Sequence, residues 1–80
     1  MFEVGTVCWV VVGAPGPQYE LYVISGYVGT AYKIKLKVFG LGSWIEDTVK
    51  VVFPVTEGAD NPEYLEYLEL GKRLAQEYYN

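Results

Sequence analysis

The sequence predicts a mainly β protein in which an antiparallel meander curls into a small barrel and a single helix follows it. Two patterns predict this fold class. From residue 32 to residue 53, apolar and polar residues alternate around a short glycine-rich turn, as is typical of two half-buried antiparallel strands. Residues 62–79 repeat apolar residues at helical spacing instead. With 80 residues, the chain has the size of one domain, with a β-barrel over residues 2–53 and a helix over residues 62–79.

The first two strands are expected on either side of a loop. Residues 2–12 carry apolar residues on both faces, which indicates a central or doubly covered strand, and Gly5 within it predicts a bulge or a close backbone approach. Residues 13–18 hold two prolines and two glycines and therefore predict a loop. Residues 19–28 predict the second strand, which turns at Gly29-Thr30 into the third.

The third and fourth strands are expected to form the central hairpin. In residues 32–39, apolar side chains alternate with three lysines, Lys33, Lys35 and Lys37. In residues 45–53, one face is expected to hold Ile45, Val49, Val51 and Phe53. The other face is expected to hold Glu46, Thr48, Lys50 and Val52. A sheet this small tends to close partly into a barrel, which also protects its edges.

The C-terminal helix is expected from Pro62 to Tyr79, because Asn61 is a good N-cap and proline suits the first helical position. Its apolar arc covers well over half of the circumference, more than a surface helix needs, and Gly71 lies near the centre. A small residue there suggests close approach to the sheet on one flank and to a second subunit on the other. The alternative is a monomer whose tyrosine-rich helix packs on its own barrel. The expected homodimer interface comprises Tyr64, Tyr67, Gly71, Leu74 and Tyr78.

The composition argues against an enzyme or a metal site. The chain has no histidine and one cysteine, Cys8, so zinc sites built from these residues, histidine-based triads and an internal disulfide are excluded. Cys8 lies in an apolar strand and is expected to be a buried, inert thiol. We expect no cofactor, no metal and no enzymatic activity. The longest apolar run, residues 7–12, is far shorter than the ~20 residues of a membrane span, and no signal peptide is visible, so a cytoplasmic protein is expected, or a nuclear one in a eukaryote.

The net charge of −4 is unevenly distributed. Four of the six cations lie in the central hairpin, whereas residues 51–80 are acidic. The lysine stripe, which comprises Lys33, Lys35 and Lys37, is interpreted as a solvated outer face that protects the sheet from edge pairing. Alternatively, with Phe39 beside it for base stacking, the lysine stripe is a platform for single-stranded nucleic acid.

A pattern of short motifs extends over residues 2–53. It consists of Phe2-x-Val-Gly5-x-Val-Cys8, then Tyr19-Glu-Leu, then the strand from Tyr32 to Phe39 with Gly40, and finally Trp44-x-Glu46. This pattern resembles the SH3-like small barrels of the Tudor and chromo-barrel group, and a helix after the barrel fits the chromo-barrel version. The resemblance implies an aromatic cage that holds a methylated lysine by cation–π attraction.

The positions that match this cage are Tyr19, Phe39 and Trp44, with Glu46 as the nearby acid. Leu41 stands where a further cage aromatic is common in that group. The alternative for Trp44 is a plug that closes the open end of the barrel. The cage and the plug are distinguished by whether the three aromatic side chains converge.

A second resemblance covers Gly5-x-Val-Cys-Trp9-Val, Leu21-Tyr-Val-Ile-Ser25 and Val52-Phe-Pro54-Val-Thr56. These segments are similar to the SH3-like toxin ribonucleases of bacterial toxin–antitoxin pairs. Leu21-Tyr22 stands where that family carries Arg-Pro, so the resemblance implies the same barrel without the expected catalytic cation.

We therefore predict a non-enzymatic binding module that uses an aromatic concavity to recognise a methylated-lysine or other cationic peptide. The alternative is a structural or inhibitory interaction factor, of phage or archaeal type, that docks on a protein partner through its acidic, tyrosine-rich helix. No membrane partner is expected.

Overall fold

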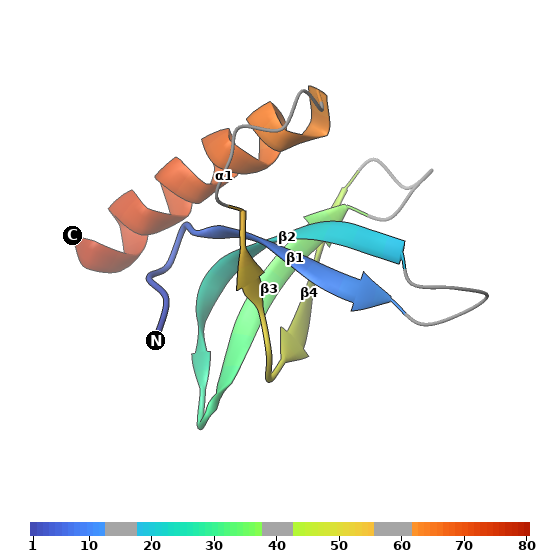
Figure 1. Ribbon diagram of the computed structural model, residues 1–80. Helices are drawn as coiled ribbons and strands as arrows, with labels where there is room; N and C mark the ends of the chain where they lie inside the picture. Colours follow the sequence, from blue (N-terminus) through green and yellow to red (C-terminus); the bar gives the residue numbers. More distant parts are fainter. Residues whose placement is uncertain (13–17, 38–42, 56–61) are drawn as a thin grey trace.

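The computed structural model describes residues 1–12, 18–37, 43–55 and 62–80. Within these residues it confirms the predicted fold class, with five antiparallel strands in one sheet and a C-terminal helix (Figure 1). The elements are β1 (Val7–Val12), β2 (Gln18–Val28), β3 (Ala31–Lys37), β4 (Trp44–Val49), β5 (Phe53–Pro54) and α1 (Pro62–Tyr79). Residues 13–17 of the predicted loop, residues 40–42 of the glycine-rich turn and the N-cap Asn61 lie outside the described residues, whereas Gln18, expected in the loop, begins β2.

The strand order β4-β3-β2-β1-β5 requires the sheet to curl. Lys50, Val51 and Val52 alone connect β4 to β5, the two opposite edges of the sheet. Those residues can span at most about 14 Å from Val49 to Phe53, whereas a flat five-stranded sheet would hold its outer strands about 19 Å apart. The edges must therefore approach each other, and Figure 1 shows the chain turning sharply between β4 and β5.

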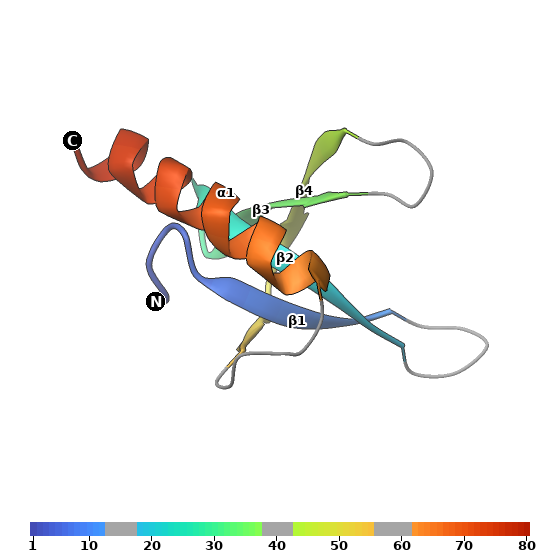
Figure 2. The ribbon, with the colours of Figure 1, turned by 90° about the horizontal axis from the view of Figure 1, so that it is seen from above.

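The sheet is apolar on both faces at its centre, as the sequence of the first strand predicts. The inner face of the curl carries a cluster of buried residues: Val4, Cys8, Tyr22, Ile24, Tyr32, Ile34, Leu36 and Val52. The outer face carries a second buried cluster, which α1 completes: Val7, Leu21, Val23, Tyr67 and Leu70. α1 thus lies across the outer side of β2 and β1 (Figure 2).

The second and third strands each begin one residue earlier than predicted, and two larger differences concern the first and fourth strands. The first strand begins at Val7 rather than at residue 2, because residues 3–6 form a bend in which Thr6 N–H and Thr6 Oγ1 both donate to Glu3 O. The fourth strand ends at Val49, where the chain leaves β3 and moves to the edge of β1. This change of partner resets the alternation, so Val52 is buried and Phe53 is exposed, the reverse of the predicted faces.

Gly5 and Gly71 bring the backbone of α1 close to the N-terminal bend. Gly5 has φ of 97°, which glycine adopts readily. A Cβ atom at Gly5 would lie 2.5 Å from Gly71 O, and one at Gly71 would overlap Gly5 O. This confirms the predicted close approach at Gly5. It also shows that the small size of Gly71 serves packing within the chain.

We predict that Gly71→Ala lowers the free energy of unfolding by about 1–3 kcal/mol, the typical cost of overpacking a well-packed site. The sign of this change in stability tests the contact, because Gly→Ala at a helix position without a close neighbour stabilises a protein by up to about 1 kcal/mol. Urea denaturation measures the difference. Gly26→Ala is the control, since its Cβ would meet only the side chain of Lys33, with Cδ at 3.6 Å and Cβ at 3.9 Å, both ordinary contact distances. Equal stability of Gly71→Ala and the natural chain would contradict the contact.

Candidate functional site

The predicted aromatic cage is only partly within the described structure. Phe39 lies outside the described residues, and Tyr19 is described only through its backbone pairing with Val11 in β2 and β1. Trp44 is the first residue of β4, opposite Lys37 of β3, and its side chain is half-buried. Convergence of the three aromatic side chains therefore stays a prediction. Of the three, Trp44 is the one whose surroundings the structure describes.

Trp44 packs against α1 and already faces a cation. Its ring meets Tyr67 edge-on, with centroids 4.8 Å apart and an interplanar angle of 75°. Lys37 Nζ lies 5.2 Å from the centroid of the Trp44 ring, within cation–π range. The same ammonium forms an ion pair with Glu66 of α1, and Lys37 N–H donates to Tyr67 Oη at 3.0 Å. Burial raises the pKa of Tyr67, which keeps its hydroxyl protonated.

The acid expected beside the cage has another partner. Glu46 forms an ion pair with Lys33 at 3.4 Å on the outer face of β3 and β4. The carboxylate next to the Lys37 ammonium, which lies over the Trp44 ring, is that of Glu66. Glu66 comes from α1, and sequence reasoning missed it. Its position follows from the docking of α1, for which a single sequence gives no local signal.

The lysine stripe lies on the outer face of β3, as predicted, because its three residues alternate with the buried Tyr32, Ile34 and Leu36. The expected protection from edge pairing is wrong, since β3 pairs with β2 on one side and with β4 on the other. Two of the three lysines have carboxylate partners, Glu46 and Glu66. Exposed pairs of this kind contribute little to stability, up to about 1 kcal/mol. They do compensate much of the positive charge that a nucleic-acid platform would use.

A second group of aromatic residues, which sequence reasoning did not identify, lies near the C-terminal end of α1. This tyrosine cluster comprises Phe2, Tyr27, Tyr32, Tyr78 and Tyr79. Its ring centroids lie 5.0–6.4 Å apart, in the range of favourable aromatic pairs. A register shift between Ile24 and Gly26 places Tyr27 directly opposite Tyr32. Such a bulge re-aims side chains and is not visible in simple alternation.

The hydroxyls of the tyrosine cluster bind the backbone of the N-terminal segment. Tyr32 Oη accepts a hydrogen bond from Phe2 N–H at 3.1 Å, and Tyr27 Oη donates to Phe2 O at 2.6 Å. Tyr79 Oη accepts from Val4 N–H at 3.0 Å. Burial, followed by the hydrogen bond with Tyr79, raises the pKa of Tyr27 to about 12. The cluster thus joins the N-terminal segment, β2, β3 and α1.

The tyrosine cluster and its neighbours in sequence leave apolar side chains exposed. We call these residues the aromatic end; it comprises Phe2, Tyr78 and Tyr79 of the cluster, with Met1 next to Phe2 and Val28 next to Tyr27 in the sequence, all of which are exposed. Of the five residues expected at a helix-mediated interface, Tyr78 belongs to the aromatic end. Tyr64 and Leu74 are half-buried, and Tyr67 and Gly71 are buried against the chain's own sheet. Tyr67 and Gly71 therefore offer little surface to a partner, and the expected homodimer interface stays a prediction.

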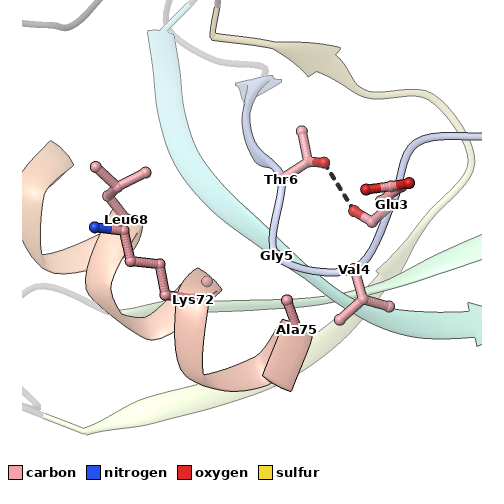
Figure 3. Close-up of a pocket in the computed structure, with 8 residues that line it drawn as sticks. Glu3, Val4, Gly5, Thr6, Leu68, Lys72 and Ala75 are labelled. Atoms are coloured by element: carbon pink, nitrogen blue, oxygen red, sulfur yellow. Dashed lines mark hydrogen bonds between the residues drawn. The ribbon is translucent and has the colours of Figure 1, made fainter. Parts of the chain in front are cut away.

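A shallow groove of about 260 Å³ lies between the bend at residues 3–6 and α1 (Figure 3). Its walls are Glu3, Val4, Gly5, Thr6, Leu68, Gly71, Lys72 and Ala75. Lys72 pairs with Glu69 at 3.8 Å, and Thr6 Oγ1 bonds to Glu3 O at 2.8 Å. The groove offers apolar contact beside two charged groups. Cys8 is fully buried, and burial raises its pKa to about 12, which confirms the predicted inert thiol.

We predict that stability falls as the pH rises from about 10 to 12, partly through Tyr27. In the unfolded chain a tyrosine titrates near 10, whereas the pKa of Tyr27 in the folded chain is about 12. Its contribution to stability is therefore complete below the unfolded pKa and is lost as the pH passes through the folded pKa. Urea denaturation at several pH values measures the slope.

Tyr27→Phe is the control for this pH dependence, because it keeps the ring and removes the ionisable group. Its slope should be shallower than that of the natural chain. Burial raises the pKa of Tyr22 and of Tyr67 as well, so some slope remains. Identical slopes for the two chains would contradict the role given to Tyr27.

No group of three or more metal-ligating side chains occurs in the parts of the chain that the structure describes. Among the same residues, no helix combines the length and the apolar character needed to cross a membrane. No protein-family model, curated protein or solved structure was found to match the chain.

Proposed function

We propose that the chain is a non-enzymatic protein-binding module, built on an SH3-like small barrel, that docks on its partner through the aromatic end. The observation that carries this proposal is the exposure of Tyr78 and Tyr79, at 52% and 56%, together with that of Val28, at 53%, which follows Tyr27 of the tyrosine cluster in the sequence. Large exposed apolar patches mark interaction sites. Tyrosine, phenylalanine and methionine are also enriched in protein interfaces, where aromatic rings give much contact area at low entropic cost.

The barrel supports this role by holding the aromatic end rigidly. Consecutive strands from β1 to β4 are neighbours and β5 returns to pair with β1, a topology consistent with an SH3-like barrel. The tyrosine cluster is fixed to this framework by the hydrogen bonds of Tyr32 and Tyr79 to the backbone of residues 2–4. Preorganised side chains lose little freedom on binding, which favours affinity.

The test replaces two exposed residues of the aromatic end in the double variant Val28→Asp, Tyr78→Asp. We expect it to lose at least tenfold in affinity for the partner, because each carboxylate would have to be desolvated in an apolar interface. The partner is captured on the immobilised chain from an extract of the source organism, and its affinity is then measured by calorimetry. Light scattering shows whether that partner is a second copy.

The matched control is Leu65→Asp, Val51→Asp. These residues are equally exposed, at 63% and 64%, but lie outside the tyrosine cluster. Thermal unfolding should show that both double variants stay folded, since substitutions of exposed residues typically change stability by less than about 0.5 kcal/mol each. Equal partner binding by the two double variants would refute docking through the aromatic end.

A second candidate function is recognition of a cationic side chain at Trp44, which the position of Lys37 favours. The Trp44 ring and Glu66 both lie beside the Lys37 ammonium, and Tyr67 packs edge-on against that ring. An aromatic ring and a carboxylate are groups that bind an alkylated ammonium by cation–π and charge attraction. In this proposal an incoming methylated lysine replaces Lys37 on the ring.

We predict that Lys37→Met binds a trimethyllysine peptide at least tenfold more tightly than the natural chain, because the internal competitor has been removed. The Trp44 indole resonance, followed by NMR during the titration, reports binding at this ring. Lys35→Met is the control, since it leaves Lys37 on the ring. If Lys37→Met shows no shift of the Trp44 resonance at millimolar peptide, the second candidate is wrong.

A further inference from the structure

Residues 2–5 are held through their main-chain atoms, in the way that a binding site holds a peptide. Phe2 N–H, Phe2 O and Val4 N–H each bond to a tyrosine hydroxyl, and Gly5 N–H donates to Ile24 O at 2.8 Å. All four hydrogen bonds involve main-chain atoms of the segment, so they do not depend on its side chains. We call Tyr27, Tyr32 and Tyr79 the tyrosine clamp.

The side chains of residues 2–4 differ in how deeply they are held. Val4 is 3% exposed and packs in the inner cluster, whereas Glu3 is exposed. Phe2 contacts the ring of Tyr32, with centroids 6.4 Å apart, and keeps 40% of its surface exposed. The site therefore reads an aromatic residue, any residue, and then an aliphatic residue, through one shallow and one deep contact.

We propose that the tyrosine clamp is a peptide-binding site for an aromatic-x-aliphatic segment of a protein partner, and that residues 2–4 are its resident occupant in the free protein. The proposal rests on the proposed function, because it names the chemistry of the partner that docks at the aromatic end. It goes further by assigning the recognition to tyrosine hydroxyl groups that contact main-chain atoms of the peptide. In such peptide recognition, main-chain hydrogen bonds give affinity and alternate side chains give specificity.

The occupant can be exchanged because little of it is buried. Val4 alone among residues 2–4 is buried, and the remaining attachments are hydrogen bonds that an incoming segment would re-form. A tethered occupant competes at a high effective concentration, of the order of millimolar. A free peptide must therefore bind weakly to the natural chain and more tightly when the attachment of the occupant is weakened.

The experiment uses the full chain and the probe acetyl-Phe-Glu-Val-Gly-amide, with binding followed by NMR. Phe2→Ser weakens the occupant without changing the clamp, and Phe2 is exposed enough for the fold to tolerate the change. We expect the probe to bind this variant at least tenfold more tightly than the natural chain. Adding Tyr79→Phe should reduce the affinity at least fivefold, since the valine N–H of the probe then loses its acceptor.

A backbone-modified probe tests the main-chain contacts directly. Methylation of the valine nitrogen removes the donor that corresponds to Val4 N–H and should abolish binding. Replacing the glutamate of the probe by alanine, at the position of the exposed Glu3, should leave the affinity unchanged. In the natural chain, excess probe should also accelerate hydrogen exchange at Val4 N–H, because the occupant is displaced; this readout stands even if Phe2→Ser fails to fold.

The inference is overturned if the probe does not bind Phe2→Ser at millimolar concentration, if Tyr79→Phe or the N-methylated probe binds equally well, or if excess probe leaves the exchange of Val4 N–H unchanged. These outcomes are distinct from failure of the proposed function. Loss of a partner through Val28→Asp, Tyr78→Asp tests docking at the aromatic end, whereas the probe tests the clamp hydroxyls alone.

Discussion

The contact between Gly5 and Gly71 is the constraint on which the position of α1 depends. Without a side chain at either residue, the backbone of α1 rests directly on the bend at residues 3–6. Because a helix rises 1.5 Å per residue, fixing Gly71 also fixes how far along the sheet the other residues of α1 lie. One turn earlier, Tyr67 reaches Lys37 N–H, and about two turns later, Tyr79 reaches Val4 N–H. One close approach therefore places both aromatic sites.

The docking of α1 also explains the charge pattern of the sequence. α1 covers β2 and β1 but leaves β3 at the edge of its footprint. The outer positions of β3 can therefore be lysines, whose stems cover apolar surface while their ammonium groups stay in water. The acidic side of α1 lies beside them, so Glu66 meets Lys37. The separation of basic sheet and acidic helix in the sequence becomes a local ion pair in the fold.

Sequence patterns predicted those features of the fold that depend on neighbouring residues in the chain. The bounds of α1, the alternation of β3 and the burial of Cys8 follow from caps, periodicity and hydrophobicity. The end of β4 at Val49 does not, because the chain exchanges one pairing partner for another that is distant in sequence. The tyrosine cluster was missed for the same reason, since its rings come from four segments and a bulge turns Tyr27 toward Tyr32. At the site around Trp44, the sequence predicted the aromatic residue. It did not predict Glu66, because the position of Glu66 depends on how α1 docks on the sheet.

The Trp44 site and the aromatic end differ in how much of their aromatic surface the chain itself already contacts. At Trp44, the ring face already meets Lys37 and the ring edge meets Tyr67, so the chain's own groups satisfy both. At the aromatic end, the hydroxyls are used on the backbone of residues 2–4, whereas much of the surface of Tyr78 and Tyr79 remains in contact with water. Burying that surface would release the free energy that drives most protein association. A partner consequently gains more at the aromatic end than at Trp44, where it must first displace an ion pair.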